Sequence, residues 1–113
     1  MKSLGGECLK AMKVMTSKQV ERFINDQERR VREDLYSLID LLIDFGHAVG
    51  MPYAKPIGKG LWELRRAERP QMRILYGFCK DTAILLVAFK KQQSAIDRPY
   101  LERAQKYLKV YCS

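Results

Sequence analysis

The chain of 113 residues carries 21 lysine and arginine residues against 13 aspartate and glutamate residues, a formal net charge of +8. This length fits one domain, residues 1–113, and a hydrophobic share of 47% argues against a disordered chain. The longest apolar run, Ala83–Phe89, is far too short to cross a bilayer, and Gly5, Gly6 and Glu7 interrupt any signal-peptide stretch. We therefore expect a cytoplasmic protein that does not enter a membrane.

The positive charge is concentrated in the second half of the chain. Residues 1–53 hold eight basic and eight acidic side chains, whereas residues 54–113 hold thirteen basic and five acidic ones. This asymmetry favours a face that binds a polyanion, and nucleic acid is the common one in the cytoplasm. The alternative is that the surplus lysine and arginine only keep a small protein soluble.

The three cysteines, Cys8, Cys79 and Cys112, are far apart and form no C-x-x-C pair. Because disulfides are rare in the cytoplasm, we expect three reduced thiols. The same spacing predicts no metal site.

The first half of the chain predicts a strand and a helical hairpin. The apolar stretch Cys8–Met15 suits an edge strand, and Thr16 and Gln19 have the spacing of a capping box, so a helix should begin at Ser17. We predict helices at 17–26 and 28–45. The second has the clearest helical periodicity, with apolar residues Val31, Leu35, Leu38, Ile39, Leu42 and Ile43.

A loop and three antiparallel strands should follow. Gly46 should end the second helix, and four glycines and prolines between Gly46 and Gly60 predict a loop with a mobile tip. The strands are predicted at Leu61–Ala67, Gln71–Cys79 and Ala83–Phe89, the last buried on both faces. Alternation places Trp62 and Leu64 toward the core, and Leu61, Glu63 and Arg65 on the opposite face.

A terminal helix should complete the domain. Asp97 is its expected cap, Pro99 lies in its first turn, and Leu101, Ala104 and Leu108 form its apolar stripe. The predicted class is α+β, with the helical hairpin and the C-terminal helix packed on one side of a small, mainly antiparallel sheet.

Three motifs then appear in order: K-P-I-G-K-G-L-W-E-L-R (Lys55–Arg65), R-I-L-Y (Arg73–Tyr76) and A-F-K-K (Ala88–Lys91). Together with the hairpin and the terminal helix, they resemble the RelE/ParE superfamily of bacterial toxins over about residues 17–110. The similarity is greatest to the phage-derived, HigB-like branch. The resemblance implies a RelE-like fold.

The resemblance also implies a function. RelE-like members are toxins of toxin–antitoxin pairs, which enter the ribosomal A site and cut messenger RNA without a metal or another cofactor. The expected partners are the ribosome, its mRNA and an antitoxin, often a small helix-turn-helix protein. Two alternatives stay open, because fold alone does not fix function: a ParE-like toxin that poisons DNA gyrase, and a non-toxic basic module that binds nucleic acid.

Metal-free RNA cleavage needs cations for the charge that gathers on the phosphate, and groups that move protons. By comparison with the family, Arg65 and Arg73 are the expected phosphate ligands, since a guanidinium bonds two phosphate oxygens. We expect both on an accessible, concave face, so that Arg73→Ala leaves the fold intact. The alternative is a pair of solvent-exposed strand arginines.

Three further residues are candidates for proton transfer or positioning. By comparison with the family, Lys91 is favoured over Lys90 as base or acid, because adjacent strand residues point to opposite faces and neighbouring cations favour the neutral amine. Otherwise it is a lysine at a strand end. Glu63 would act as a base, hold Arg65 or form a surface ion pair. Tyr100 lies near where relatives place a tyrosine.

Five other cations are expected to bind RNA: Lys55, Lys59, Arg66, Arg69 and Lys90. We expect Trp62 and Tyr76 in the core. Some HigB-like nucleases use a histidine near the end of the chain. The single histidine here, His47, lies outside every motif, and we expect it in a loop.

Overall fold

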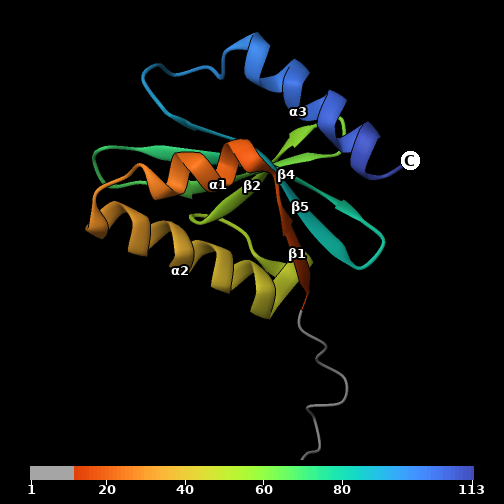
Figure 1. The fold of residues 1–113 in the computed structure, drawn as a ribbon, viewed down its shortest axis with the longest axis horizontal. Coiled ribbons are helices and arrows are strands. Elements are labelled where there is room, and N and C mark those ends of the chain that lie inside the picture. Colours follow the sequence, from red (N-terminus) through yellow and green to blue (C-terminus); the bar gives the residue numbers. More distant parts are fainter. Residues whose placement is uncertain (1–11) are drawn as a thin grey trace, which may run out of the picture.

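The computed structural model describes residues 12–113 and shows an α+β fold (Figure 1). Its elements in chain order are β1 (Lys13–Thr16), α1 (Lys18–Asn25), α2 (Arg29–Phe45), the 3₁₀ helix η2 (Gly46–Ala48), β2 (Ala54–Gly58), β3 (Leu61–Arg66), β4 (Met72–Cys79), β5 (Thr82–Lys90) and α3 (Arg98–Tyr111). The predicted class, the helical hairpin, the three central strands and the terminal helix are confirmed. Residues 8–11 of the expected first strand lie outside the described residues.

The five strands form one sheet in the order β1-β5-β4-β3-β2. All neighbours are antiparallel except β1, which runs parallel to β5 at one edge. The prediction that 46–60 is a loop was wrong in part, because β2 pairs with β3 at the other edge of the sheet. Its glycine and proline are tolerated there, since an edge strand leaves part of its backbone unpaired.

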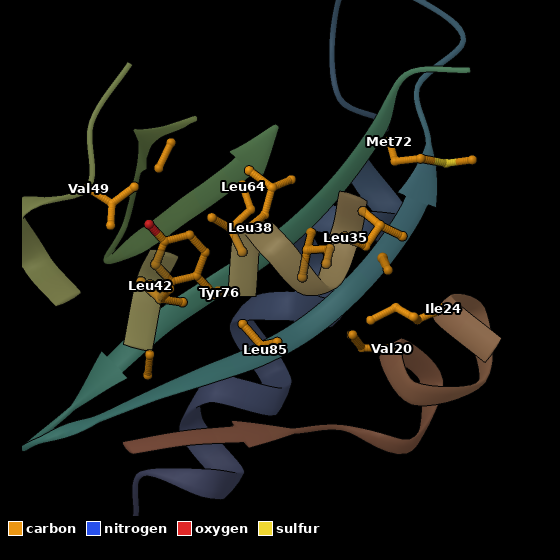
Figure 2. Close-up of a cluster of buried hydrophobic side chains, with 14 of the residues drawn as sticks. Val20, Ile24, Leu35, Leu38, Leu42, Val49, Leu64, Met72, Tyr76 and Leu85 are labelled. Atoms are coloured by element: carbon orange, nitrogen blue, oxygen red, sulfur yellow. The ribbon is translucent and has the colours of Figure 1, made fainter. Parts of the chain in front are cut away.

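Helices cover both faces of the sheet, which corrects the expectation that all of them pack on one side. The first core lies between α1, α2 and one sheet face, with Ile24, Leu35 and Leu42 packed on Leu64 and Tyr76 (Figure 2). Trp62 packs against this core, as predicted. The second core lies between α3 and the other face, and joins Ala104 to buried strand residues including Leu61, Leu75, Val87 and Phe89.

The helical hairpin is anchored to β5 by side chains at its beginning. Ser17, and not Thr16, caps α1: its hydroxyl accepts a hydrogen bond from the backbone of Val20 and donates one to the carbonyl of Leu86. The amide of Gln19 both donates to and accepts from the backbone of Ala88, at 2.9 and 2.8 Å. Gln19, which the sequence predicted as part of a capping box, therefore ties α1 to the sheet.

The terminal helix α3 is held to the second face at three places. The ring of Tyr100 stacks on that of Phe89, with centroids 4.3 Å apart, and Leu108 lies directly over Gly77. A disulfide then joins Cys79, at the end of β4, to Cys112, just after α3. The expectation of reduced thiols is wrong for this pair, because the fold brings the two Cα atoms to 5.6 Å. Cys8 lies outside the described residues.

Between residues 12 and 113, the structure has no helix long and apolar enough to span a membrane. The same residues form no group of three His, Cys, Asp or Glu side chains able to hold a metal ion. His47 follows the end of α2 at Gly46 and packs on Phe78, with ring centroids 3.8 Å apart.

Candidate active site

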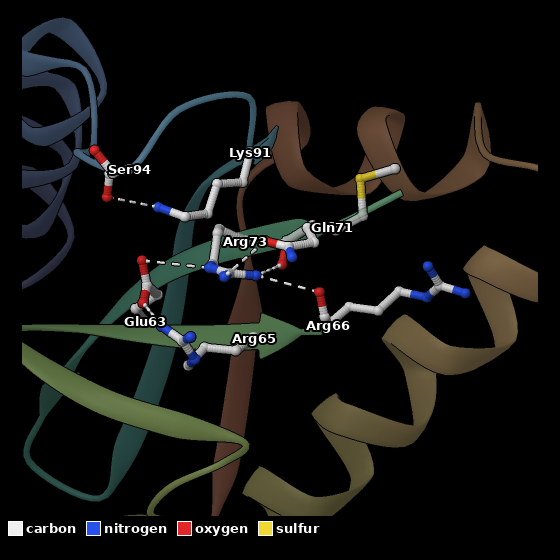
Figure 3. A network of polar contacts seen from close by, with 8 residues as sticks. Glu63, Arg65, Arg66, Gln71, Arg73, Lys91 and Ser94 are labelled. Carbon is white, nitrogen blue, oxygen red and sulfur yellow. Dashed lines mark hydrogen bonds and ion pairs between the residues drawn. The ribbon is translucent and has the colours of Figure 1, made fainter. Parts of the chain in front are cut away.

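The candidate site lies where β3, β4 and β5 meet the segment before α3 (Figure 3). The β3–β4 register places Arg65 directly opposite Arg73, and Glu63 two residues earlier shares their face. The alternation read from the sequence is confirmed for all three. This face is the one that α3 partly covers, so the site lies beside a helix and not on an open concave surface.

Glu63 is a buried carboxylate between the two arginines. One oxygen accepts a hydrogen bond of 2.8 Å from Nη1 of Arg65, and the other lies 3.6 Å from Nε of Arg73. Only 1% of Glu63 is exposed. A substrate hydroxyl therefore has no access to the carboxylate, and the geometry suits Glu63 to positioning and not to proton abstraction.

Arg73 is buried, which contradicts the expectation of an accessible strand arginine. Its Nη1 donates to the carbonyls of Arg66 and Met72, and its Nη2 to the side chain of Gln71. Burial lowers the pKa of Arg73, the charge of Arg65 lowers it further, and Glu63 opposes both. Arginine stays charged under such shifts, so Arg73 supplies a fixed positive charge inside the protein.

Arg65 is the accessible member of the pair. About 20% of its side chain is exposed, and it has one protein acceptor, Glu63, among the described residues. Its other guanidinium donors make no hydrogen bond to the described residues, and the bond to Glu63 fixes the orientation of the group. Such an arginine is suited to bind an anion that arrives from solvent.

Lys91 follows the end of β5 and continues the face of Phe89, which pairs with Arg73. Its Nζ donates to the carbonyl of Ser94 at 2.9 Å, and its backbone N–H donates to Gln71 (Figure 3). Lys90 pairs with Met72, whose side chain belongs to the first core, so the register assigns Lys90 to that face, while both lysines line the same cleft. Lys91 is the one that lies on the face of the arginines.

An open cleft of about 650 Å³ adjoins these residues. It runs between the β3–β4 loop and the segment after β5, and its lining includes the cations Arg69, Lys90 and Lys91 together with Gln71. Three cations in one cleft attract a polyanion to the edge of the site. Two of the five cations expected to bind RNA, Arg69 and Lys90, therefore line this cleft.

Tyr100 lies in the first turn of α3, after the segment that carries Lys91 and Ser94. It lines a smaller hollow of about 130 Å³ with residues that include Phe89, Lys90, Lys91 and Asp97. Its ring is fixed by the parallel stack on Phe89. Tyr100 and Lys91 therefore share one hollow beside the arginines.

The other predicted cations have different positions. Lys55 is exposed on β2 and pairs with Glu63, so it shares the face of the site from the sheet edge. Lys59 lies in the β2–β3 turn, at the opposite end of the sheet. Arg66 does not join the set: it is buried toward α2, pairs with Asp34 at 2.9 Å and donates to the carbonyls of Glu68 and Pro70.

Sequence reasoning missed Gln71 and Ser94. Gln71 contacts Arg73 through its side chain and Lys91 through its backbone, while the carbonyl of Ser94 fixes Nζ of Lys91. The position of Gln71, two residues before Arg73 on one strand, was a signal that the two share a face. No pattern in the sequence marked Ser94, because its contact is made by the backbone.

Comparisons with known proteins agree with the fold. A family model described as phage derived protein Gp49-like matches residues 22–109. The structure is similar to the Escherichia coli RelE toxin, with a TM-score of 0.59, 12% identity, and coverage of 87% of this chain and all of that one. It is also similar to a chain of the RelBE2 toxin–antitoxin complex from Mycobacterium tuberculosis, with a TM-score of 0.56, 16% identity, and coverage of 72% and 99%.

No curated protein sequence matches the chain. The two solved structures confirm the RelE-like fold that the three sequence motifs predicted. The HigB-like branch stays a prediction.

Proposed function

Because the chain belongs to the phage-derived Gp49-like family, we propose that it is the toxin of a toxin–antitoxin pair and cleaves messenger RNA on the ribosome. The two solved structures described above contain RelE toxins, one of them in complex with its antitoxin. The proposed reaction is attack of a ribose 2′-hydroxyl on the adjacent phosphorus. The bond to the 5′-oxygen breaks, which leaves a 2′,3′-cyclic phosphate and a 5′-hydroxyl.

One observation carries this proposal: Arg65, a partly exposed arginine held by Glu63, lies on the sheet face that Lys91 continues, and Lys91 lines a cleft with two further cations. Glu63 and Arg73 hold Arg65 in place from inside the protein, and the cleft approaches the same end of the sheet. A preorganised cation stabilises charge on a transition state better than a mobile one, because it does not reorganise during the reaction. RNA lying in the cleft would bring a phosphate to Arg65.

The roles of the chain's residues follow from their access to solvent. Arg65 binds the phosphate oxygens that become more negative as the 2′-oxygen attacks. Arg73 and Glu63 position Arg65 without touching RNA. Arg69, Lys90 and Lys55 attract the RNA backbone, and this attraction weakens as salt rises.

Proton transfer is assigned to Lys91 and Tyr100, which line one hollow. One removes the proton of the 2′-hydroxyl, and the other donates a proton to the departing 5′-oxygen. Asp97 supplies the only carboxylate among the described residues that line this hollow, and it accepts a hydrogen bond from Gln93. We expect slow intrinsic chemistry that depends on the ribosome to align the RNA.

The proposed antitoxin is a helix-turn-helix protein that presses an acidic or helical segment onto the basic half of the chain, or displaces α3. The excess of cations in residues 54–113 supports this, because complementary charge speeds encounter and fixes orientation. The proposed setting is the cytoplasm, where ribosomes are found. A complex whose interface used only α1 and α2 would contradict this arrangement.

The test uses purified protein, ribosomes and a message of defined sequence. We expect cleavage only when ribosomes are present, with 2′,3′-cyclic phosphate ends, and no loss on adding a metal chelator at a concentration that leaves ribosomes intact. Arg65→Ala is the inactive variant and Lys59→Ala, at the opposite end of the sheet, is its matched control. Growth arrest with translation intact and replication blocked first would instead support a gyrase-directed toxin.

A further inference from the structure

The only disulfide among residues 12–113 joins the two ends of the segment that supplies most of the second core. Cys79 ends β4 and Cys112 follows α3, with 33 residues of sequence separation. Between them lie β5, the segment that carries Lys91 and Ser94, and α3 itself. The bond therefore closes a covalent loop around one side of the candidate site.

Besides the disulfide, α3 packs on the second core through Ala104 and the partly buried Tyr100, Leu101, Tyr107 and Leu108. Of its 14 residues only Ala104 is fully buried, and Val110 and Tyr111 near its end are exposed. It approaches the sheet closely at Gly77, where an added Cβ would lie 2.9 Å from Leu108. A helix with one fully buried residue opens locally more easily than α2, which has four.

The disulfide is within reach of small molecules. Cys112 is exposed and Cys79 is half-buried. Both line an open hollow of about 380 Å³ with Met15, Lys80 and Tyr111. Thiol–disulfide exchange needs such access, because a thiolate must approach a sulfur atom.

We propose that Cys79 and Cys112 form a reversible redox latch that controls whether α3 stays docked on the sheet. In the oxidising direction, the thiolate of one cysteine attacks a sulfur of a low-molecular-weight disulfide such as oxidised glutathione and releases one glutathione thiol. The second cysteine then attacks the mixed disulfide and releases the other. Two protein thiols are oxidised, one small disulfide is reduced to two thiols, and the two thiol protons end on glutathione.

The latch acts on the candidate site through α3. In the disulfide form, both ends of the helix are fixed, and Tyr100 stays stacked on Phe89 beside Lys91. In the dithiol form, the C-terminal end of α3 is released and the helix opens more often, which exposes Leu75 and Phe89 of the second core. Cytoplasmic disulfides in ordinary cells are usually transient and responsive to redox state. We therefore expect the balance between the disulfide and dithiol forms to change with the redox state of the cell.

The experiment uses the full chain with Cys8→Ser, which removes the third thiol as an alternative partner. The protein is equilibrated in buffers of increasing oxidised-to-reduced glutathione ratio, and its free thiols are alkylated and counted by mass. We expect a two-thiol transition within the range of ratios that glutathione buffers provide. Two free thiols at every ratio, or a disulfide that persists at every ratio, would overturn a reversible latch.

Hydrogen exchange of the two forms tests the effect on the helix. We expect amides of residues 98–111 to exchange at least tenfold faster in the dithiol form, while those of 29–45 in α2 are unchanged. Cys112→Ser should exchange fast in every buffer. Equal exchange of α3 in both forms would overturn the proposal. The cellular setting rests on the proposed function. Neither thiol counting nor hydrogen exchange involves RNA cleavage, so a failure of the redox latch is distinguishable from a failure of the proposed function.

Discussion

Arg65 and Arg73 lie directly opposite each other on β3 and β4, and the carboxylate of Glu63 contacts both guanidinium groups. Two like charges side by side repel, so the pair is stable only because an anion lies between them. Their difference in exposure then separates their roles. Arg65 is partly exposed to solvent, and Arg73 is buried against backbone carbonyls.

We expect Arg73→Ala to destabilise the protein strongly. Removing one partner from a buried ion pair leaves an incompletely compensated charge on Glu63 and costs about 3–5 kcal/mol. Urea unfolding followed by circular dichroism measures this loss. Loss of toxicity in this variant would then come at least in part from unfolding.

A double variant tests the cause of that loss. In Glu63→Gln with Arg73→Met, the buried charge and its partner are both absent, and we expect at least half of the lost stability to return. A double variant no more stable than Arg73→Met alone would show that Glu63 is not what makes the loss of Arg73 costly.

We expect Arg65→Ala to remain folded and to lose activity. Glu63 loses its 2.8 Å hydrogen bond but stays 3.6 Å from Arg73, so some stability is lost and folding is checked by urea unfolding. A lost transition-state contact costs about 3–4 kcal/mol, or a few hundred-fold in cleavage rate. Arg65→Lys should lose most of this activity too, because an ammonium does not bind two phosphate oxygens side by side. Single-turnover cleavage on ribosomes measures both. Full activity of Arg65→Lys would reduce Arg65 to a general positive charge.

We expect Lys91→Ala to lower the cleavage rate by about 10²–10⁴-fold, the usual contribution of a proton-transfer group. Lys91→Arg should stay equally slow, because a guanidinium does not give up its proton near neutral pH. The matched control is Lys59→Ala, which removes the same charge at the other end of the sheet. Wild-type activity of Lys91→Arg would make the lysine a binding cation only.

We expect Tyr76→Phe to be neutral or slightly stabilising at pH 7. The hydroxyl of Tyr76 is buried without a hydrogen-bond partner among the described residues, and burial raises its pKa to about 12. Because the folded protein holds this proton more tightly than the unfolded chain, the stability that Tyr76 contributes is complete below pH 10 and is lost as pH rises toward 12.

The measurement compares the unfolding free energies of wild type and Tyr76→Phe at pH 8 and pH 11.5. The difference should move toward the phenylalanine variant by about 2 kcal/mol at the higher pH, since one pKa unit corresponds to about 1.4 kcal/mol. An unchanged difference would mean that the hydroxyl ionises in the folded protein as it does in water.

The sequence was sufficient to predict which side chains share a face of each strand. Side chains alternate along any strand, so Glu63 and Arg65 had to share one face, and a short connection to β4 had to bring Arg73 close to them. Lys91 was separable from Lys90 on the same ground. The helices followed from their apolar period and from Gly46, because these are local properties of the chain.

Only the tertiary structure decided what covers each face. Alternation is silent on whether a helix packs over a strand, so it gave no reason to expect α3 over Leu75 and Phe89, or Arg66 buried against Asp34. It also gave no sign that β2 adds to the sheet edge or that Cys79 meets Cys112 across 33 residues. Burial and such long-range pairs depend on how distant segments pack, and packing separates a fixed internal arginine from one that is free to bind a phosphate.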